Sequence, residues 1–262
     1  MASRRAAERV GKAAGRLPAA SKRAGRGGRD ALPAAPTTRE RILRTAFTLF
    51  HEQGYHATGI ATILREADVN AGSLYHFFPS KDDLLIGVLE YALGALEPAV
   101  MGPAARRTED PIGRVFALLE QYREWMGAWG CRMGCPIGNL ALEVADDHPE
   151  ARRLIHANFE NWANAVRKWL DDAGDRLPAT VDRGQLARFV LTVMEGGIMQ
   201  GRAAGGLGPF DDGVAQLRSY FDALEAVARG GAGWDMVRTR GPARGRGDAK
   251  RGPRIRGRKA AD

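Results

Sequence analysis

Apolar residues recur at helical spacing through most of the chain between residues 37 and 229, and no segment shows a convincing strand pattern. Clusters of Gly, Pro, Asn and Asp separate the apolar segments from one another. The pattern predicts nine helices, at about 38–53, 59–67, 71–78, 81–97, 111–129, 137–145, 149–173, 182–204 and 211–229. We therefore expect an all-α protein.

Polar side chains mark the starts of the first four helices. A Ser, Thr or Asn before an apolar run can accept an unpaired backbone N–H, and an acidic residue three positions later completes a capping box. Gly54 can take the left-handed conformation that ends the first helix, and Pro79 disfavours helical geometry in the residue before it. The expected caps are Thr37 with Glu40, Thr58, Asn70, and Ser80 with Asp83.

The helices at 59–67 and 71–78 are short and are joined by the tight turn Asp68-Val69-Asn70. Two such helices, braced by longer ones, form a helix-turn-helix whose second helix enters the DNA major groove with its N-terminal residues at the base edges. The alternative is a small helical bundle whose polar aromatic residues only cover a core. The residues expected to contact DNA are Thr58, Asn70, Ala71, Gly72, Ser73, Tyr75, His76 and Lys81.

The stretch from Thr37 to Leu85 closely resembles the DNA-binding head of TetR/AcrR-type bacterial transcriptional regulators. Asp68 replaces the usual glycine of the turn, and Asp adopts left-handed geometry more readily than most residues. Asn70 replaces Ser or Thr as an equally good cap, and Ala71 replaces a polar residue that can contact DNA. The resemblance rests on Ile42, Ala46, Leu49, Phe50, Gly54-Tyr55, Thr58, Ile63, Ala67, Val69, and Gly72-Ser73-Leu74-Tyr75-His76-Phe77-Phe78 with Lys81.

This resemblance implies a nine-helix, TetR-like architecture. It places a DNA-binding domain at 37–97, with its helix-turn-helix at about 59–78, and a larger helical domain at 98–230 that binds a ligand and dimerises. It implies a homodimer bound to a palindromic operator in double-stranded DNA. A small-molecule inducer, apolar or electrophilic, would change the separation of the two heads and release the DNA.

The last two predicted helices are apolar over wide faces, which suits packing both on their own domain and on a partner. By the resemblance they form the four-helix bundle of the dimer. The alternative is a face buried within the monomer alone. The candidate dimer contacts are Phe189, Val193, Leu217, Phe221 and Leu224.

Four of the five tryptophans fall on the predicted helices 111–129 and 149–173. Small-molecule sites are mostly apolar with a few polar groups, so this aromatic cluster is a candidate cavity wall, although aromatic residues at helical spacing also fit an ordinary core. The candidate ligand contacts are Cys135, Tyr122, Trp125, Trp129, Phe159, Trp162 and Met194.

Cys135 precedes a predicted helix start and has Arg132 nearby, and both features favour a thiolate. The segment 131–140 is similar to that of TetR-type regulators that sense electrophiles through one cysteine, so Cys135 is a candidate sensor. The alternative is a small buried cysteine in the cavity wall. Cys131 and Cys135 have no third ligand near them in the sequence, so we expect no metal site and no cofactor.

The net charge of +8 lies at the two ends of the chain. Residues 1–36 hold nine basic and two acidic residues, and residues 234–262 hold ten basic and three acidic ones. Both ends are rich in Arg and Gly and lack apolar periodicity, so 1–36 and 231–262 are predicted to be disordered basic arms. They either contact the DNA backbone or are dispensable tails.

The absence of a run of about twenty apolar residues, of a secretory signal and of a disulfide framework indicates a cytoplasmic, nucleoid-associated protein with no membrane span. We predict a ligand- or electrophile-responsive transcriptional regulator, most simply a repressor, with no catalytic residue. One alternative is a cysteine-dependent enzyme that acts on electrophiles, with Cys135 as its nucleophile and His148 or His156 as its base. The other is a DNA-coating protein driven by the basic arms, whose binding would be independent of sequence and strongly salt-dependent.

Overall fold

The computed structural model describes residues 35–230, and within that range the chain forms nine α-helices of seven residues or more and no β-strand. Every predicted helix is present, so the all-α fold is confirmed. The predicted arms lie outside the described residues up to residue 34 and from residue 231. The helices are α2 (Thr38–Gln53), α3 (Ile60–Ala67), α4 (Ala71–Phe77), α5 (Lys81–Leu96), α7 (Pro111–Ala128), α8 (Pro136–Val144), α9 (Pro149–Asp172), α10 (Arg183–Ala204) and α11 (Gly208–Ala228).

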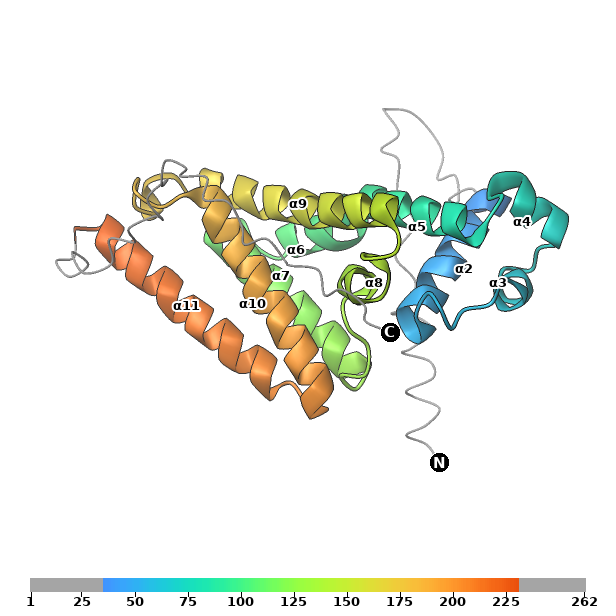
Figure 1. Cartoon of the computed structure of the whole chain (residues 1–262). Helices are drawn as coiled ribbons and strands as arrows, with labels where there is room; N and C mark the ends of the chain where they lie inside the picture. Colours follow the sequence, from blue (N-terminus) through green and yellow to red (C-terminus); the bar gives the residue numbers. More distant parts are fainter. Residues whose placement is uncertain (1–34, 231–262) are drawn as a thin grey trace, which may run out of the picture.

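Helices α2, α3 and α4 form a small lobe at one end of the molecule, which together with the start of α5 (residues 37–85) we call the head (Figure 1). Thr37 and Glu40 make the reciprocal capping box of α2, and Asn70 Oδ1 accepts the Ser73 N–H at 2.7 Å to cap α4. Asp68 takes the left-handed conformation in the turn, with φ 52° and ψ 56°. The head closes on fully buried side chains that include Ile42, Phe50, Ile63 and Leu74.

Thr58 does not cap α3, so this prediction was wrong. The residue before the helix is Gly59, which has no side chain to offer. The Thr58 hydroxyl lies 2.6 Å from the Gly54 carbonyl and 3.3 Å from the Leu49 carbonyl, and Thr58 is 0% exposed. It therefore ties the turn after α2 back to the end of that helix. Gly54 ends α2 with φ 87° and ψ 160°, a positive φ outside the expected left-handed helical region.

Helix α5 begins where Ser80 accepts the Asp83 N–H at 3.0 Å, and it runs from the head into the rest of the molecule (Figure 1). It continues through a π-helical turn at Glu97–Met101 and the four-residue helix α6 at Gly102–Ala105, which the sequence pattern did not predict. By length and composition alone Lys81–Ala105 could span a membrane, but 61% of its apolar window is buried inside the protein. Its contacts with α2 and α9 are those of a core helix.

The other helices form a larger body, in which α9 packs against α5, α7 and α10. Helices α10 and α11 pair along their length and slant away from the head (Figure 1). Gly205, in left-handed conformation at φ 66°, ends α10, and α11 starts at Gly208, three residues before the predicted Asp211. Helix α8 contacts α2 of the head on one side and α9 of the body on the other.

Candidate DNA-reading head and ligand pocket

The N-terminal turn of α4 lies open to solvent at the end of the head. Leu74 is fully buried and fixes the opposite face of the helix in the core, while Tyr75 is 48% exposed. Phe77, which the sequence analysis did not single out, is 38% exposed one residue beyond the other candidates. The predicted DNA contacts exposed here are Asn70, Ala71, Gly72, Tyr75 and His76, with Ser73 half-buried.

Lys81 is half-buried in the first turn of α5. Its ammonium lies 4.3 Å from the centre of the Tyr55 ring, which is a cation–π contact. Burial lowers the pKa of Lys81, and the nearby Glu143 and Asp82 carboxylates act in the opposite direction. The Tyr55 hydroxyl donates to Asp82, and burial together with this bond raises the pKa of Tyr55. Lys81 is therefore held beside the turn between α2 and α3.

Thr58, the remaining predicted DNA contact, does not belong to this exposed surface. Its side chain is completely buried and bonded to backbone carbonyls of the head. A group without solvent exposure has no access to DNA, so the prediction of a DNA contact at Thr58 was wrong. Its role is to position the turn that leads into α3.

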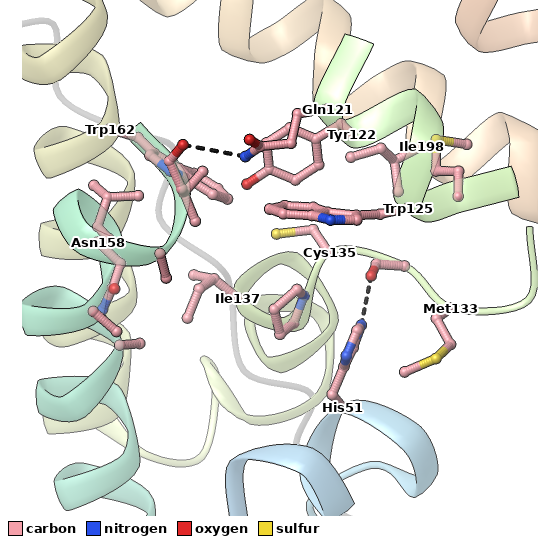
Figure 2. Close-up of a pocket in the computed structure, with 18 of the residues that line it drawn as sticks. His51, Gln121, Tyr122, Trp125, Met133, Cys135, Ile137, Asn158, Trp162 and Ile198 are labelled. Carbon is pink, nitrogen blue, oxygen red and sulfur yellow. Dashed lines mark hydrogen bonds between the residues drawn. The ribbon is translucent and has the colours of Figure 1, made fainter. Parts of the chain in front are cut away.

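A cavity of about 430 Å³ lies in the body (Figure 2). This volume falls within the range of about 300–1,000 Å³ typical of small-molecule pockets. The wall is mostly apolar and aromatic, and segments from α2 to α10 contribute to it. Five of the seven predicted ligand contacts line it: Tyr122, Trp125, Trp129, Cys135 and Trp162.

The other two predicted contacts, Phe159 and Met194, do not line the cavity. Phe159 packs against Trp162 with ring centres 6.3 Å apart, and Met194 is 0% exposed in the core. Helical periodicity points both side chains inward, but it does not separate a cavity wall from solid core. The structure therefore does not place these two residues in the wall of the cavity.

Two buried amides, which the sequence analysis missed, bring polar groups to the cavity wall. Gln121 Nε2 donates to the carbonyl of Val100 at 3.1 Å, in the π-helical turn after α5 (Figure 2). Asn158 Nδ2 donates to the carbonyls of Leu89 and Leu154, at 3.1 and 2.9 Å. Asn158 thus uses its amide nitrogen for two backbone carbonyls and Gln121 uses one of its two N–H donors, so both side chains are held in place beside the cavity.

Trp162 and Tyr122 meet edge to face in the same wall, with ring centres 5.8 Å apart. The Nε1 of Trp162 is buried and has no hydrogen-bond partner among the described residues. Burial raises the pKa of Tyr122 well above its ordinary value, so the hydroxyl stays protonated. Among the tryptophans of the wall, Trp162 is therefore the one whose indole donor is buried without a partner in the described part of the chain.

Cys135 is the N-cap of α8, as predicted, and its Sγ accepts the Gly138 N–H at 3.4 Å. The thiolate prediction was wrong. Cys135 is 3% exposed, and burial together with the Glu195 carboxyl raises the pKa of the thiol well above its ordinary value. Arg132 is exposed and does not offset this. A protonated thiol is a poor nucleophile, so Cys135 serves here as part of the cavity wall.

Glu195 is a largely buried carboxyl on α10 beside Cys135. Burial raises the pKa of Glu195 from 4.5 to about 7, and a bond from the Cys135 thiol acts in the opposite direction. Its Oε1 is buried with no hydrogen-bond partner in the described part of the chain. A Cβ on Gly138 would lie 2.7 Å from its Oε2, so the glycine permits this close approach of α8 to α10.

The histidine at the cavity is His51 of α2, which the sequence analysis missed. Its Nε2 donates to the Gly134 carbonyl at 2.7 Å, and burial lowers its pKa although this bond acts in the opposite direction (Figure 2). The Nδ1 of His148 lies 3.8 Å from the Oδ2 of Asp82, and His156 is exposed. Neither of the two histidines predicted as a base for Cys135 lines the cavity.

At the far end of α8, Glu143 holds the turn that follows α2. Its Oε2 accepts the Tyr55 N–H at 2.8 Å, and its Oε1 accepts the His56 N–H at 2.7 Å. Cys135, Pro136 and Ile137 line the cavity at the opposite end of the same helix. Helix α8 therefore touches both the cavity and the head.

Comparisons with known proteins agree with this arrangement. Residues 42–88 match the sequence profile of bacterial regulatory proteins of the tetR family, and residues 111–217 match that of the tetracyclin repressor-like C-terminal domain. The HTH-type transcriptional regulator YxaF of Bacillus subtilis (strain 168) is 32% identical over 163 residues, which cover 62% of this chain and 83% of the relative. The chain belongs to the TetR family.

A second relative matches this chain over a longer stretch. The HTH-type transcriptional regulator Rv0196 of Mycobacterium tuberculosis is 30% identical over 188 residues, which cover 69% of this chain and 92% of that protein. The crystal structure of the regulatory protein TetR from Rhodobacter sphaeroides has the same fold, with a TM-score of 0.63 at 23% identity, over 70% of this chain and 98% of that one.

The predicted function as a helix-turn-helix, DNA-binding transcriptional regulator is confirmed by this family membership. The TetR family binds DNA operators, dimerises and binds small-molecule ligands. The comparisons give no support to the alternatives of a cysteine-dependent enzyme or a DNA-coating protein.

The predicted dimer contacts of this TetR-family chain divide into two groups. Phe189 is 45% exposed and packs against Tyr220, with ring centres 5.7 Å apart, while Val193 is half-buried. The other three belong to the core of the monomer, so the prediction that they contact the partner was wrong. They are Leu217, Phe221 and Leu224, at 1%, 1% and 8% exposed. Met199 on α10, which was not predicted, is 59% exposed.

Proposed function

We propose that this TetR-family regulator is a repressor that acts in the bacterial cytoplasm as a homodimer on a palindromic operator. A largely apolar small molecule that enters the cavity releases the DNA. The observation that carries this proposal is the double contact of α8, which lines the cavity near Cys135 and holds the head through Glu143. Residues 37–97 act as the DNA-binding domain, and residues 98–230 bind the ligand and the second protomer.

In the head, α4 enters the major groove with its N-terminal turn at the base edges. Ala71, Gly72 and Ser73 are the residues that approach the bases, because they precede the buried anchor Leu74 on an exposed turn. Contacts to phosphates position a protein on DNA without reading its sequence, and Lys81 with Tyr75 and His76 supplies these contacts. The head carries six acidic and five basic residues, so the placement of its helices rather than its net charge directs it to DNA.

The second protomer packs on the outer face of α10 and α11. Phe189 and Met199 expose large apolar side chains there, with the half-buried Val193 and Tyr220 between the two helices. Large apolar side chains that stay exposed on a monomer are candidate contacts with a partner. A two-fold dimer places two heads on half-sites about 34–36 Å apart, one helical turn of DNA.

Release of the DNA follows from the conformational equilibrium between two states of the dimer. A ligand shifts such an equilibrium only as far as its affinities for the two states differ. The cavity wall includes Cys135 and Ile137, so a ligand that enlarges the cavity displaces the start of α8. Glu143 transmits that displacement to the backbone of Tyr55 and His56, and thus to the turn before α3.

Selection of bound fragments from the organism's own genomic DNA by the full-length chain tests the proposal. The expected fragments share an inverted repeat, and scrambling one half of it weakens binding by at least about a hundredfold, since each mismatched base pair costs about 1–3 kcal/mol. Removing residues 1–34 and 231–262 lowers the affinity for all DNA and leaves the preference intact. Equal binding to every fragment, lost when both arms are removed, would overturn the proposal in favour of DNA coating.

A further inference from the structure

One buried donor beside the cavity lacks a hydrogen-bond partner among the described residues, namely Nε1 of Trp162. It belongs to a residue of the cavity wall that is 5% exposed. Buried donors are almost always paired in native proteins, and an unpaired one destabilises the fold by about 1–3 kcal/mol. An unpaired donor in the wall of a cavity is explained if a ligand completes it.

The charges around the cavity exclude an ionic ligand. Arg107 is the permanently charged residue of the wall, and Glu124 already pairs both of its terminal nitrogens at 2.9 and 2.7 Å. Burial lowers the pKa of His51, which keeps its imidazole neutral. Glu195 does not line the cavity. An ionised ligand would lose its hydration here without gaining a partner of opposite charge.

The aromatic residues of the wall favour a flat molecule. Trp125 and Trp129 lie with their rings nearly parallel, at 27° and 6.3 Å between centres. The Tyr122 ring packs edge to face on both Trp125 and Trp162, with ring centres 5.1 and 5.8 Å apart (Figure 2). Aromatic faces of this kind stack on planar ligands.

We propose that the cavity binds an uncharged, flat and largely apolar molecule with a carbonyl-type oxygen, which accepts the hydrogen bond of Trp162 Nε1. This inference rests on the proposed function, because it takes the cavity to be a ligand site. It goes further in naming the chemical class of the ligand and the residue that selects it. A pure hydrocarbon of the same shape leaves the indole donor unpaired and binds more weakly.

The test compares 2-acetylnaphthalene with 2-ethylnaphthalene, which share a ring system and differ in the carbonyl oxygen. Isothermal titration calorimetry on the full-length chain without DNA gives both affinities. Trp162→Phe keeps an aromatic ring and removes the donor. We expect it to weaken binding of the ketone about tenfold, close to the value of one buried hydrogen bond, and to change binding of the hydrocarbon less than twofold.

Trp169→Phe is the matched control. Trp169 lies two turns further along α9, is 8% exposed and does not line the cavity. This variant loses an indole donor from the same helix and is expected to bind both probes like the unsubstituted chain. Comparing variant with parent for each probe also cancels the different solubilities of the two probes.

Nuclear magnetic resonance gives a second measurement that needs no variant to fold. The indole N–H resonance of Trp162 in the unsubstituted chain should shift strongly with the ketone and little with the hydrocarbon. Equal loss of affinity for both probes in Trp162→Phe would overturn the inference, because it would show that the shape of the indole ring and not its N–H decides binding. Failure of the ketone to bind the unsubstituted chain would overturn it as well.

The outcome for the proposed function is separate, because these measurements contain no DNA. A chain that binds the ketone through Trp162 but keeps its hold on the operator supports this inference and contradicts ligand-driven release. If the chain binds neither probe but selects an inverted repeat from genomic DNA, this inference is contradicted and the DNA-binding proposal is supported.

Discussion

The carboxylate of Glu143 accepts the backbone N–H of Tyr55 at 2.8 Å, and the adjacent N–H of His56 completes the pair at 2.7 Å. The two partners are 88 positions apart in the chain, and they join the end of α8 to the turn after α2. Hydrogen bonds to an ionised carboxylate are about twice as strong as neutral ones. This contact ties the cavity-lining helix α8 to the head, in addition to the bond between His51 and Gly134.

Glu143→Gln should uncouple the cavity from the head. Glutamine has one acceptor oxygen, so one of the two backbone N–H groups loses its partner, and the charge that strengthens the bonds is lost. We expect affinity for the cavity ligand to change less than twofold, while the effect of that ligand on operator affinity falls severalfold. Operator binding with and without ligand, measured by fluorescence anisotropy, gives the ratio.

Asp146→Asn is the control for Glu143→Gln, because it removes one negative charge from an exposed carboxylate just beyond the same helix end. It should leave the ratio unchanged. If the two variants lower the ratio equally, loss of charge explains the effect and the hydrogen bonds of Glu143 do not carry the signal.

Glu195 should make stability depend on pH. Burial raises its pKa from 4.5 to about 7, so the folded state holds the proton more tightly than the unfolded chain. The stability that protonated Glu195 contributes is fully present below the pKa of the group in the unfolded chain. It is lost as the pH rises through the pKa in the folded protein. Glu195→Gln removes this dependence, and the shift corresponds to roughly 3 kcal/mol. In urea unfolding, we expect the free energy of unfolding of the variant to rise relative to that of the parent by about 2 kcal/mol between pH 5.5 and pH 8.

The control for the pH effect is Glu90→Gln, an exposed carboxylate on α5. Its stability should run parallel to that of the parent over the same pH range. A Glu195→Gln profile parallel to the parent would mean that Glu195 ionises in the folded protein as it does in water. The groups that face Glu195 are the Cys135 thiol and the Tyr122 hydroxyl, both of which stay protonated in this pH range.

Substitutions in α4 and at the start of α5 should separate base recognition from contacts to the DNA backbone. Ser73→Ala or Ala71→Ser changes the surface that faces the bases, so we expect a changed preference among operator variants. Tyr75→Ala or Lys81→Ala removes a phosphate contact, so all sequences should lose affinity alike. Binding to a panel of single-base operator variants measures both effects. Unchanged preference in the first pair of variants would show that α4 docks in another orientation.

Thr58→Val should weaken the head without touching DNA. Valine matches threonine in shape but leaves the Gly54 carbonyl without its buried donor, at a cost of about 1–3 kcal/mol in unfolding free energy. Affinity for all DNA sequences should fall together. Thr192→Val, which removes an exposed hydroxyl bonded to the Arg188 carbonyl, should cost less than about 0.5 kcal/mol. A changed base preference in Thr58→Val would instead place this residue at the DNA.

Local signals in the sequence predicted the helices well. The capping box of Thr37 and the cap at Asn70 are contacts between residues three apart, which a sequence contains in full. The prediction for Thr58 was wrong because Gly59 is the residue that precedes α3, and the Thr58 hydroxyl bonds to the Gly54 carbonyl instead. The π-helical turn at Glu97–Met101 leaves no mark in apolar periodicity, although it supplies the Val100 carbonyl to Gln121.

The cavity was only partly predictable, because its wall combines segments that are distant in the chain. Periodicity identified Trp125 and Trp162 as inward-facing, and it gave the same indication for Met194, which lies in solid core. Nothing local predicts that His51 of the head reaches Gly134, which is 83 positions away. The thiolate prediction for Cys135 weighed its helix position but not the burial that raises the thiol pKa.

The central claim is that an occupied cavity weakens the hold of the head on DNA. The most direct test is the dissociation constant of a labelled, genomically selected operator with no ligand and with saturating 2-acetylnaphthalene. Our account predicts that this constant rises at least about tenfold, within the range of allosteric couplings in proteins. An unchanged constant, while calorimetry shows the cavity to be full, would contradict it.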